Sequence, residues 1–228
     1  GCKNSEISWE ILSPNEELKI GLKNGMKSSG DLFYEVYQKQ EDGYQQIVLP
    51  SQLGIETEDT RFVQHLVHVN TDSRENQSIS YELISGPFQR CNNKYNEKKL
   101  TFRNRDSNLL TLTFRAYNNG IAFQYSFPGN SGQQIRIMRE LTQFHIDKGN
   151  FWAHPYDTVT SWAPSYETFY TGPLSVGTSA PWNKNGWAFP LLIESNNCWM
   201  LLSEAGFDGS YGGSHLQSDC DHGIYKIK

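Results

Sequence analysis

The sequence lacks a long hydrophobic run, an excess of positive charge and closely spaced cysteines. Its most apolar stretch, Trp187 to Ile193, has the length of a strand and falls far short of the ~20 apolar residues that span a membrane as a helix. A net charge of -5 argues against binding to nucleic acid or to a membrane surface through basic residues. The four cysteines are too widely spaced to form a thiolate zinc site. No stretch carries apolar residues at helical spacing over three turns, so the fold is not helical.

The clearest pattern in the chain is a β-hairpin at residues 109–128. Apolar and polar residues alternate over 109–117 and again over 121–127, as expected for two half-buried strands. Asn118-Asn119-Gly120 separates the two runs, and these residue types tolerate the positive φ of a tight hairpin turn. Pro128 cannot donate to a strand ladder and ends the second strand. We predict that this hairpin lies at the centre of a sheet.

The rest of the chain is read as further short strands. Period-two segments are expected at 7–12, 18–23, 31–38, 44–49, 62–69, 79–84, 133–140 and 143–146. A second hairpin is expected from Trp187–Glu194 and Cys198–Ala205. The segment 70–77 is read as a polar tip, and 90–99 as an exposed crossing loop. Residues 149–186, rich in aromatic residues and proline, are expected to form a long loop region of the kind that carries function.

About fifteen strands are too many for one sheet, so the fold class expected is all-β with two large packed antiparallel sheets. A chain of 228 residues is long enough for one large β domain or two small ones.

Several segments resemble the N-terminal domain of glycoside hydrolase family 97, the bacterial α-glucosidases and α-galactosidases. The matching pieces, in order, are Ser13-Pro14-Asn15 with Leu18, the segment 50–56, the hairpin 110–128, Glu140 with Phe144, Tyr166-Glu167 with Tyr170, and 191–205. In the hairpin, Gln124 stands where the family usually has arginine, and after Ala205 the sequence departs from the family pattern.

The resemblance implies a β-super-sandwich like that of galactose mutarotase. It assigns residues 1–12 to an N-terminal segment and 13–228 to the sandwich domain. In the family a catalytic (β/α)8 barrel follows this domain and carries the general acid and the base or nucleophile. The barrel is absent from this chain, so no catalytic residue is expected here and the chain by itself is not expected to hydrolyse glycosides.

The resemblance also implies a role for Glu167, as a calcium ligand shared with the barrel. One carboxylate cannot supply the six to eight oxygens that calcium prefers, so calcium binding is expected only with the barrel present. Without the family, Glu167 would be read as an exposed loop glutamate paired with lysine. Glu204 is read as a buried glutamate that needs a polar partner.

The aromatic residues of 149–186 have two readings. Trp162 and Tyr166 are the substrate-binding candidates, and with Trp152 and Trp182 they have flat faces suited to sugar rings. The same residues could as easily be buried, either as a core of the loop region or as an interface with the barrel, and the interface is the preferred interpretation.

Cys2 is followed by a polar stretch that resembles the mature start of a bacterial lipoprotein. This predicts lipidation of Cys2 and a periplasmic or outer-membrane-anchored protein, with membrane contact only through the lipid. The ordinary alternative is an exposed cysteine near a frayed terminus. Cys198 is read as core, and whether Cys91 and Cys220 form a disulfide is left open.

The expected function is support of a glycoside hydrolase that cleaves α-glucosides or α-galactosides, with an oligosaccharide substrate and the barrel as partners. Two alternatives come from other classes. A free-standing aldose epimerase would need a histidine acid and a carboxylate base, for which His145, His154 and Glu204 are the candidates. A surface glycan-binding module would use the aromatic residues, Trp162 and Trp182 among them, as a sugar platform.

Overall fold

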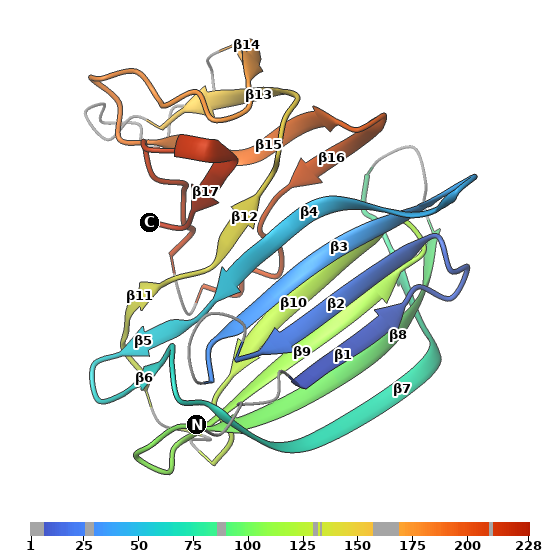
Figure 1. The fold of residues 1–228 in the computed structure, drawn as a ribbon, viewed down its shortest axis with the longest axis vertical. Helices are drawn as coiled ribbons and strands as arrows, with labels where there is room; N and C mark the ends of the chain where they lie inside the picture. The colour runs from blue at the N-terminus through green and yellow to red at the C-terminus, as the bar shows by residue number, and fades with distance from the viewer. Residues whose placement is uncertain are drawn as a thin grey trace, which may run out of the picture. The chain divides into compact units, whose positions relative to one another are not determined.

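The computed structural model describes residues 7–25, 30–85, 90–129, 132, 134–156, 169–209 and 212–228. Within these residues the chain forms seventeen strands and one short helical turn, Asp221–Gly223 (Figure 1). The chain divides into two compact units. The first comprises 1–46 and 54–138, and the second 47–53 and 139–228. The all-β fold predicted from the alternation is confirmed, with several antiparallel sheets in place of two large ones.

The first unit is a sandwich of two antiparallel sheets. One sheet has the order β1-β2-β3-β4 and the other the order β10-β9-β8-β7, and β1 and β2 pack against β8, β9 and β10. A small sheet of β11, β5 and β6 completes the strands that begin in this unit. Their bounds are β1 Ile7–Leu12, β2 Leu18–Asn24, β3 Leu32–Gln40, β4 Gly43–Leu53, β5 Ile55–Thr57, β6 Arg61–Phe62, β7 Val67–Glu82, β8 Arg90–Arg103, β9 Leu109–Tyr117, β10 Gly120–Ser126 and β11 Ile137–Glu140.

The predicted hairpin is confirmed as β9 and β10, with Tyr117 opposite Gly120 and Asn118-Asn119 as the turn. The inward face of β9 is completely buried, and its members are Leu110, Leu112, Phe114 and Ala116. Each large apolar side chain removed from water in this way stabilises the fold by roughly 1.5–3 kcal/mol. The predicted place at the centre of a sheet holds for β9 only, because β10 lies at the end of the strand order.

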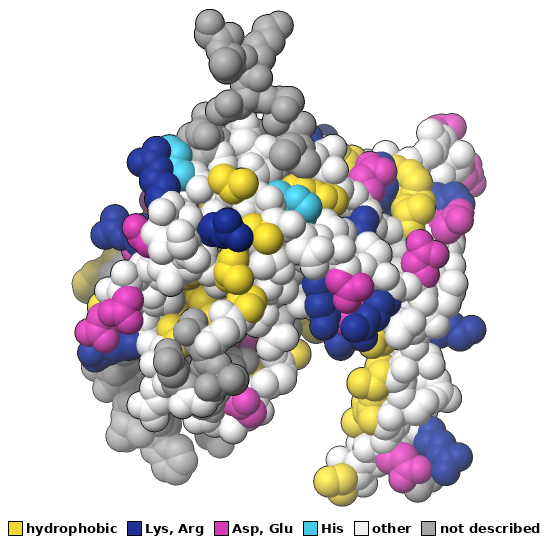
Figure 2. Space-filling view, turned by 90° about the horizontal axis from the view of Figure 1, so that it is seen from below, with side chains coloured by type: hydrophobic (Ala, Val, Ile, Leu, Met, Phe, Trp, Pro, Cys, Tyr) yellow, Lys and Arg dark blue, Asp and Glu magenta, His cyan; other side chains and the backbone are white. Residues whose placement is uncertain are grey.

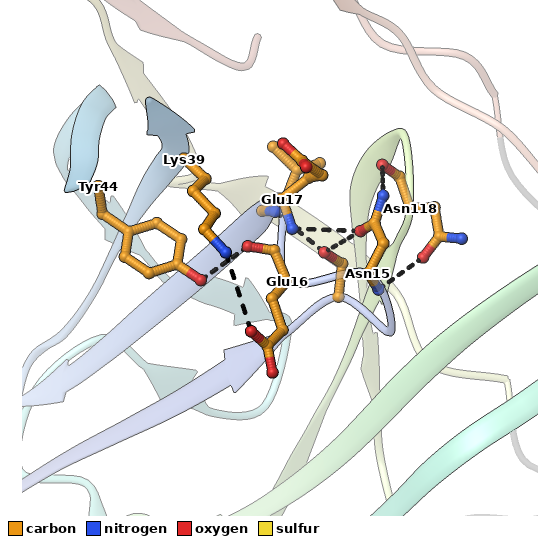
Figure 3. Close-up of polar contacts among 8 residues, drawn as sticks. Asn15, Glu16, Glu17, Lys39, Tyr44 and Asn118 are labelled. Atoms are coloured by element: carbon orange, nitrogen blue, oxygen red, sulfur yellow. Dashed lines mark hydrogen bonds and ion pairs between the residues drawn. The ribbon is translucent and has the colours of Figure 1, made fainter. Parts of the chain in front are cut away.

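Polar contacts join the β1–β2 turn to the β9–β10 turn (Figure 3). The backbone N–H of Asn15 donates to Asn118 Oδ1 at 3.1 Å, and Asn15 Nδ2 donates to the Asn118 carbonyl at 3.4 Å. Tyr44 donates its hydroxyl proton to the Glu16 carbonyl at 2.7 Å. Within the first turn, Ser13 donates to Asn15 Oδ1 at 2.7 Å. The Ser13-Pro14-Asn15 motif therefore links the two sheets of the sandwich at one end.

Two expectations for the first unit are wrong. Residues 70–77, read as a polar tip, are the middle of β7, and residues 90–99, read as a crossing loop, are most of β8. The 14-residue β8 pairs on both sides, with β7 and with β9. Its first seven residues are polar apart from Cys91 and Tyr95, and none of them is buried; the first buried side chain of the strand is the charged Glu97. An apolar period therefore could not reveal it.

The second unit contains residues 47–53 of β4, followed in strand order by β12 and β17, and a sheet of order β14-β13-β15-β16. Rings from both sheets form its core. Phe151 on β13 packs edge-on against Trp187 on β15, with ring centroids 5.2 Å apart, and against Tyr225 on β17, with ring centroids 5.7 Å apart. The remaining bounds are β12 Gln143–His145, β13 Asn150–Pro155, β14 Thr171–Ser175, β15 Trp187–Ser195, β16 Cys198–Leu202 and β17 Ile224–Lys226.

The second predicted hairpin is confirmed as β15 and β16, which turn through Asn196 and Asn197, both at positive φ. The long loop expected at 149–186 is corrected in part, because β13 and β14 lie within it. Cys91, Cys198 and Cys220 are free thiols, and Cys198 is buried as expected. Among the described residues the structure contains no helix that is long and apolar enough to cross a membrane.

Candidate functional site

The sheet of β13, β15 and β16 in the second unit is apolar on both faces. Its inner face carries Phe151 opposite Ile193, both completely buried. Its outer face carries a cross-strand row of Trp152, Leu192 and Leu201. Strands that are apolar on both faces are typical of sheets covered on both sides. The outer face is nevertheless open among the described residues, since Leu201 is 63% exposed.

A pair of tryptophans dominates this outer face. Trp152 and Trp199 stack with ring centroids 5.3 Å apart and an interplanar angle of 28°, although Trp199 remains 59% exposed. The backbone of Gly172 lies directly against Trp152, so that a Cβ at that position would come within 2.5 Å of the ring. Trp152 is therefore held between the neighbouring strand and Trp199, and the pair presents a flat apolar surface to solvent.

Two carboxylates lie together in the chain segments that flank this sheet. Glu204, just after β16, accepts hydrogen bonds from the Ser214 hydroxyl at 2.6 Å and from the Ser214 N–H at 2.9 Å. Glu140 ends β11, and burial raises the pKa of its carboxyl. The negative charge of Glu204 raises it further, against a hydrogen bond with Thr142 that lowers it. Glu204 is only partly buried, against the prediction of a buried glutamate, and Ser214 is its polar partner.

His215 follows in the same cluster. Its ring stacks on Tyr156 with centroids 3.8 Å apart and planes within 5°. Burial lowers the pKa of this imidazole, and the nearby charge of Lys228 lowers it further. A hydrogen bond to the Asn185 backbone and the charge of Glu204 act in the opposite direction. The net result is a lowered pKa of the His215 imidazole.

The structure places only some of the predicted site residues. Cys2, Trp162, Tyr166 and Glu167 lie outside the described residues. His145 and His154, the epimerase candidates, lie on β12 and β13. The His154 ring packs on the Tyr170 ring with centroids 4.0 Å apart. Trp182 is almost fully exposed.

Sequence reasoning missed Trp199, although the signal was present. Over Cys198–Leu202 every residue is apolar, so the strand offers an apolar side chain to both faces. This is the pattern of a strand that is covered on both sides.

The first unit has a shallow polar depression of about 410 Å³, lined by Glu56, Arg61, His65, Asn104 and Asp106 among others. None of the described residues that line it is Phe, Tyr or Trp, so it lacks the flat apolar surface that sugar rings prefer. Among the described residues no group of three or more His, Cys, Asp or Glu side chains is placed to hold a metal ion.

On the face shown in Figure 2, basic and acidic side chains are interspersed.

The fold defines the class of protein, an antiparallel β-sandwich domain, and its second unit carries an exposed aromatic face. The chain belongs to the Glycosyl-hydrolase 97 N-terminal family, which matches residues 11–228. No protein among the curated sequences matches it.

Solved structures share this fold. A beta-arabinopyranosidase superimposes with a TM-score of 0.83 and 23% identity over 96% of this chain and 35% of its own. A Glycoside Hydrolase Family 97 enzyme from Pseudoalteromonas sp. strain K8, in complex with acarbose, gives a TM-score of 0.75 and 19% identity over 96% of this chain and 31% of its own. A variant of that enzyme (E480Q) in complex with panose gives 0.74 and 19% over the same shares. The chain thus spans about a third of the length of these proteins.

Proposed function

We propose that this chain is the N-terminal domain of a glycoside hydrolase that cleaves α-glucosides or α-galactosides, and that it supports a catalytic barrel elsewhere in a longer protein. The carrying observation is the family match over residues 11–228. The solved structures of similar fold are about three times as long as this chain, and two of them hold the oligosaccharides acarbose and panose. Acarbose and panose favour an α-glucoside as the first substrate to test.

The outer face of β13, β15 and β16 is the proposed contact surface for the barrel. Its centre is aliphatic, since Leu192 and Leu201 lie beside the Trp152–Trp199 pair. An exposed apolar area of this kind marks an interaction site. Aliphatic side chains suit a protein partner better than a sugar ring, which packs on flat aromatic surfaces.

A substitution at Trp199 tests this contact. In the 228-residue chain Trp199→Ser is expected to change the free energy of unfolding by less than about 1 kcal/mol, because the ring is mostly in solvent. In the longer enzyme the same change is expected to lower the melting temperature and the activity together. Equal, small effects in both proteins would contradict a barrel contact at this face.

Hydrolysis tests the enzyme class. The longer protein is expected to release 4-nitrophenol from the α-glucoside or the α-galactoside, and the 228-residue chain alone is expected to be inactive. Hydrolysis by the isolated chain, or no hydrolysis of either glycoside by the longer protein, would contradict the proposal.

Glu167 is proposed as a calcium ligand shared with the barrel. Carboxylate oxygen suits a hard cation, and the other ligands would have to come from the barrel because calcium takes six to eight oxygens. Chelation is expected to lower the activity of the longer enzyme, and Glu167→Gln to weaken calcium binding measured by calorimetry. Calcium affinity unchanged by Glu167→Gln would contradict this role.

Cys2 is proposed as a lipid attachment site in a periplasmic or outer-membrane-anchored protein. The support is its polar sequence context alone. Incorporation of labelled palmitate into the native protein, lost in Cys2→Ser, is the expected result. Absence of label in the native protein would contradict it.

The second candidate function is a non-catalytic glycan-binding module, which the exposed Trp152–Trp199 stack favours. Affinity electrophoresis through starch or galactan would then retard the 228-residue chain, and Trp199→Ala would abolish the retardation. Trp182→Ala tests whether the other predicted platform residue contributes, because that ring is almost fully exposed. Unretarded migration of the wild-type chain would leave the barrel-supporting function.

A further inference from the structure

The end of β7 is an open sheet edge with the composition of a pairing strand. Among the described residues β7 pairs only with β8, and it lies last in the order β10-β9-β8-β7 (Figure 1). Residues 77–82 pair regularly with 95–90 of β8, beyond the point where β9 ends opposite Tyr95. The segment 77–83 contains no proline, no glycine and a single charge, Glu82. Natural proteins normally protect a long edge strand with lysines, prolines or bulges, and this segment has none of these.

The two faces of this projecting ribbon differ. One face carries Ile79, Tyr81 and Leu83, each about 40% exposed. The other face carries Ser78, Ser80 and Glu82, with Glu82 paired to Arg90 of β8 at 3.0 Å. A two-stranded ribbon is marginal alone in water and gains from a third strand. The bulge between Arg74 and Gln77 ends the regular edge on one side.

We propose that two copies of this chain associate by antiparallel pairing of the 77–83 segments of β7, with the two-fold axis at Ser80. This register sets Ile79 of each copy opposite Tyr81 of the other, a β-branched residue against an aromatic one. Such cross-strand pairs are favourable. The ladder hydrogen bonds of the free edge are satisfied at the same time.

Charge complementarity selects this register. With the axis at Ser80, Glu82 of the second copy lies opposite Ser78, whose neighbour on β8 is Lys94. Each Glu82 is then flanked by Arg90 of its own copy and Lys94 of the other across the strands. Moving the register by two residues sets Glu82 opposite Asn76 or Ser80 instead. Their neighbours on β8, Asn96 and Asn92, are neutral.

Opposite charges placed at Ser78 test the register by their sign. Ser78→Glu sets a glutamate against Glu82 of the other copy twice, and Ser78→Lys sets a lysine there. Directly opposed like charges cost, and opposite charges gain, roughly 0.2–1 kcal/mol per pair. With two pairs, the dimer dissociation constant is expected to rise with glutamate and fall with lysine, each by roughly 2- to 30-fold.

The control is Ser73→Glu. Ser73 is also exposed on β7 and opposite a lysine of β8, Lys98, but it lies outside the pairing segment. Sedimentation equilibrium of the 228-residue chain over a concentration series gives the dissociation constants, and circular dichroism verifies that each variant is folded.

The expected outcome is a wild-type dimer that is weakened by Ser78→Glu, strengthened by Ser78→Lys and unchanged by Ser73→Glu. A monomer at every concentration would overturn the proposal. So would effects of the same sign from both charges at Ser78, or an equal effect from Ser73→Glu, because general charge repulsion would then explain the result.

Discussion

The ion pair of Glu97 with Arg115 is the most informative place to perturb the first unit. The two residues lie directly opposite each other on β8 and β9, and Arg115 Nε contacts Glu97 Oε2 at 2.7 Å. The Glu97 side chain is only 4% exposed, and Lys99 approaches it at 3.6 Å. The Arg115 guanidinium also lies 4.7 Å from the centre of the Tyr95 ring. The carboxylate is thus buried in a polar strand and depends on Arg115.

Substituting Arg115 should destabilise the protein more than substituting Glu97. Arg115→Met leaves the buried carboxylate with only Lys99 and Arg74, which lies opposite it on β7. Removing one partner of a buried pair costs about 3–5 kcal/mol, and the lower end is expected because the Arg115 side chain is itself 37% exposed. Glu97→Gln removes the buried charge and retains an acceptor for Arg115, so it should cost only about 1–2 kcal/mol. The double variant should be more stable than the sum of the single changes predicts, by roughly 1–3 kcal/mol. Urea unfolding of the 228-residue chain measures all three.

The control is the Glu58–Arg136 pair, in which the charged atoms are 3.7 Å apart and both side chains are exposed. Arg136→Met should cost less than about 1 kcal/mol of unfolding free energy, because surface pairs contribute little. If Arg115→Met cost no more than Arg136→Met, the argument that burial makes Glu97 dependent on its partner would be refuted.

The pH dependence has a definite sign. Burial by itself would raise the pKa of Glu97, but the hydrogen bond and charge of Arg115, with Lys99 and Arg74, outweigh it and lower the pKa. A lowered folded-state pKa stabilises the fold above the ordinary carboxyl pKa of about 4.3, and this stabilisation is lost as the pH falls through the folded-state value. The difference in unfolding free energy between wild type and Glu97→Gln should therefore be largest at pH 7 and should decrease below about pH 4.

Three further predictions concern other elements. Glu140→Gln should stabilise the protein at pH 8 but not at pH 4, because the raised pKa of Glu140 means that stability falls as the pH rises through it; equal effects at both pH values in thermal unfolding would contradict this. Gly186→Ala should lower the free energy of unfolding by about 3 kcal/mol or more, since φ is +127° and a Cβ would lie 1.8 Å from the Leu216 carbonyl oxygen. The control Gly212→Ala should change it by no more than about 0.5 kcal/mol, because a Cβ at Gly212 would face open space. Phe114→Ala, at a completely buried position of β9, should cost about 3–5 kcal/mol in urea unfolding, and a loss below 1 kcal/mol would contradict the burial.

The sequence by itself determined the elements whose signal is local. The hairpin of β9 and β10 follows from strict alternation on either side of Asn118-Asn119-Gly120. The hairpin of β15 and β16 follows from two apolar runs on either side of the turn residues Ser195-Asn196-Asn197. A side chain's face in a strand is set by its parity, and the turn sets the register. The buried face of β9 could therefore be named residue by residue before the structure, and the family resemblance supplied the sandwich.

Tertiary structure alone decided the strands and contacts that depend on distant partners. Residues 90–99 are polar and are expected to form a loop, yet they form a strand because β7 pairs along them and β9 pairs with residues 95–99. Trp152 meets Trp199, and Glu140 meets Glu204, across more than forty residues of sequence. The alternation of apolar and polar residues along a strand does not predict which distant residues will meet. Strands pair through backbone hydrogen bonds, which polar and apolar residues form alike. The environment of a side chain depends on the segments that pack against it, and these can be distant in sequence.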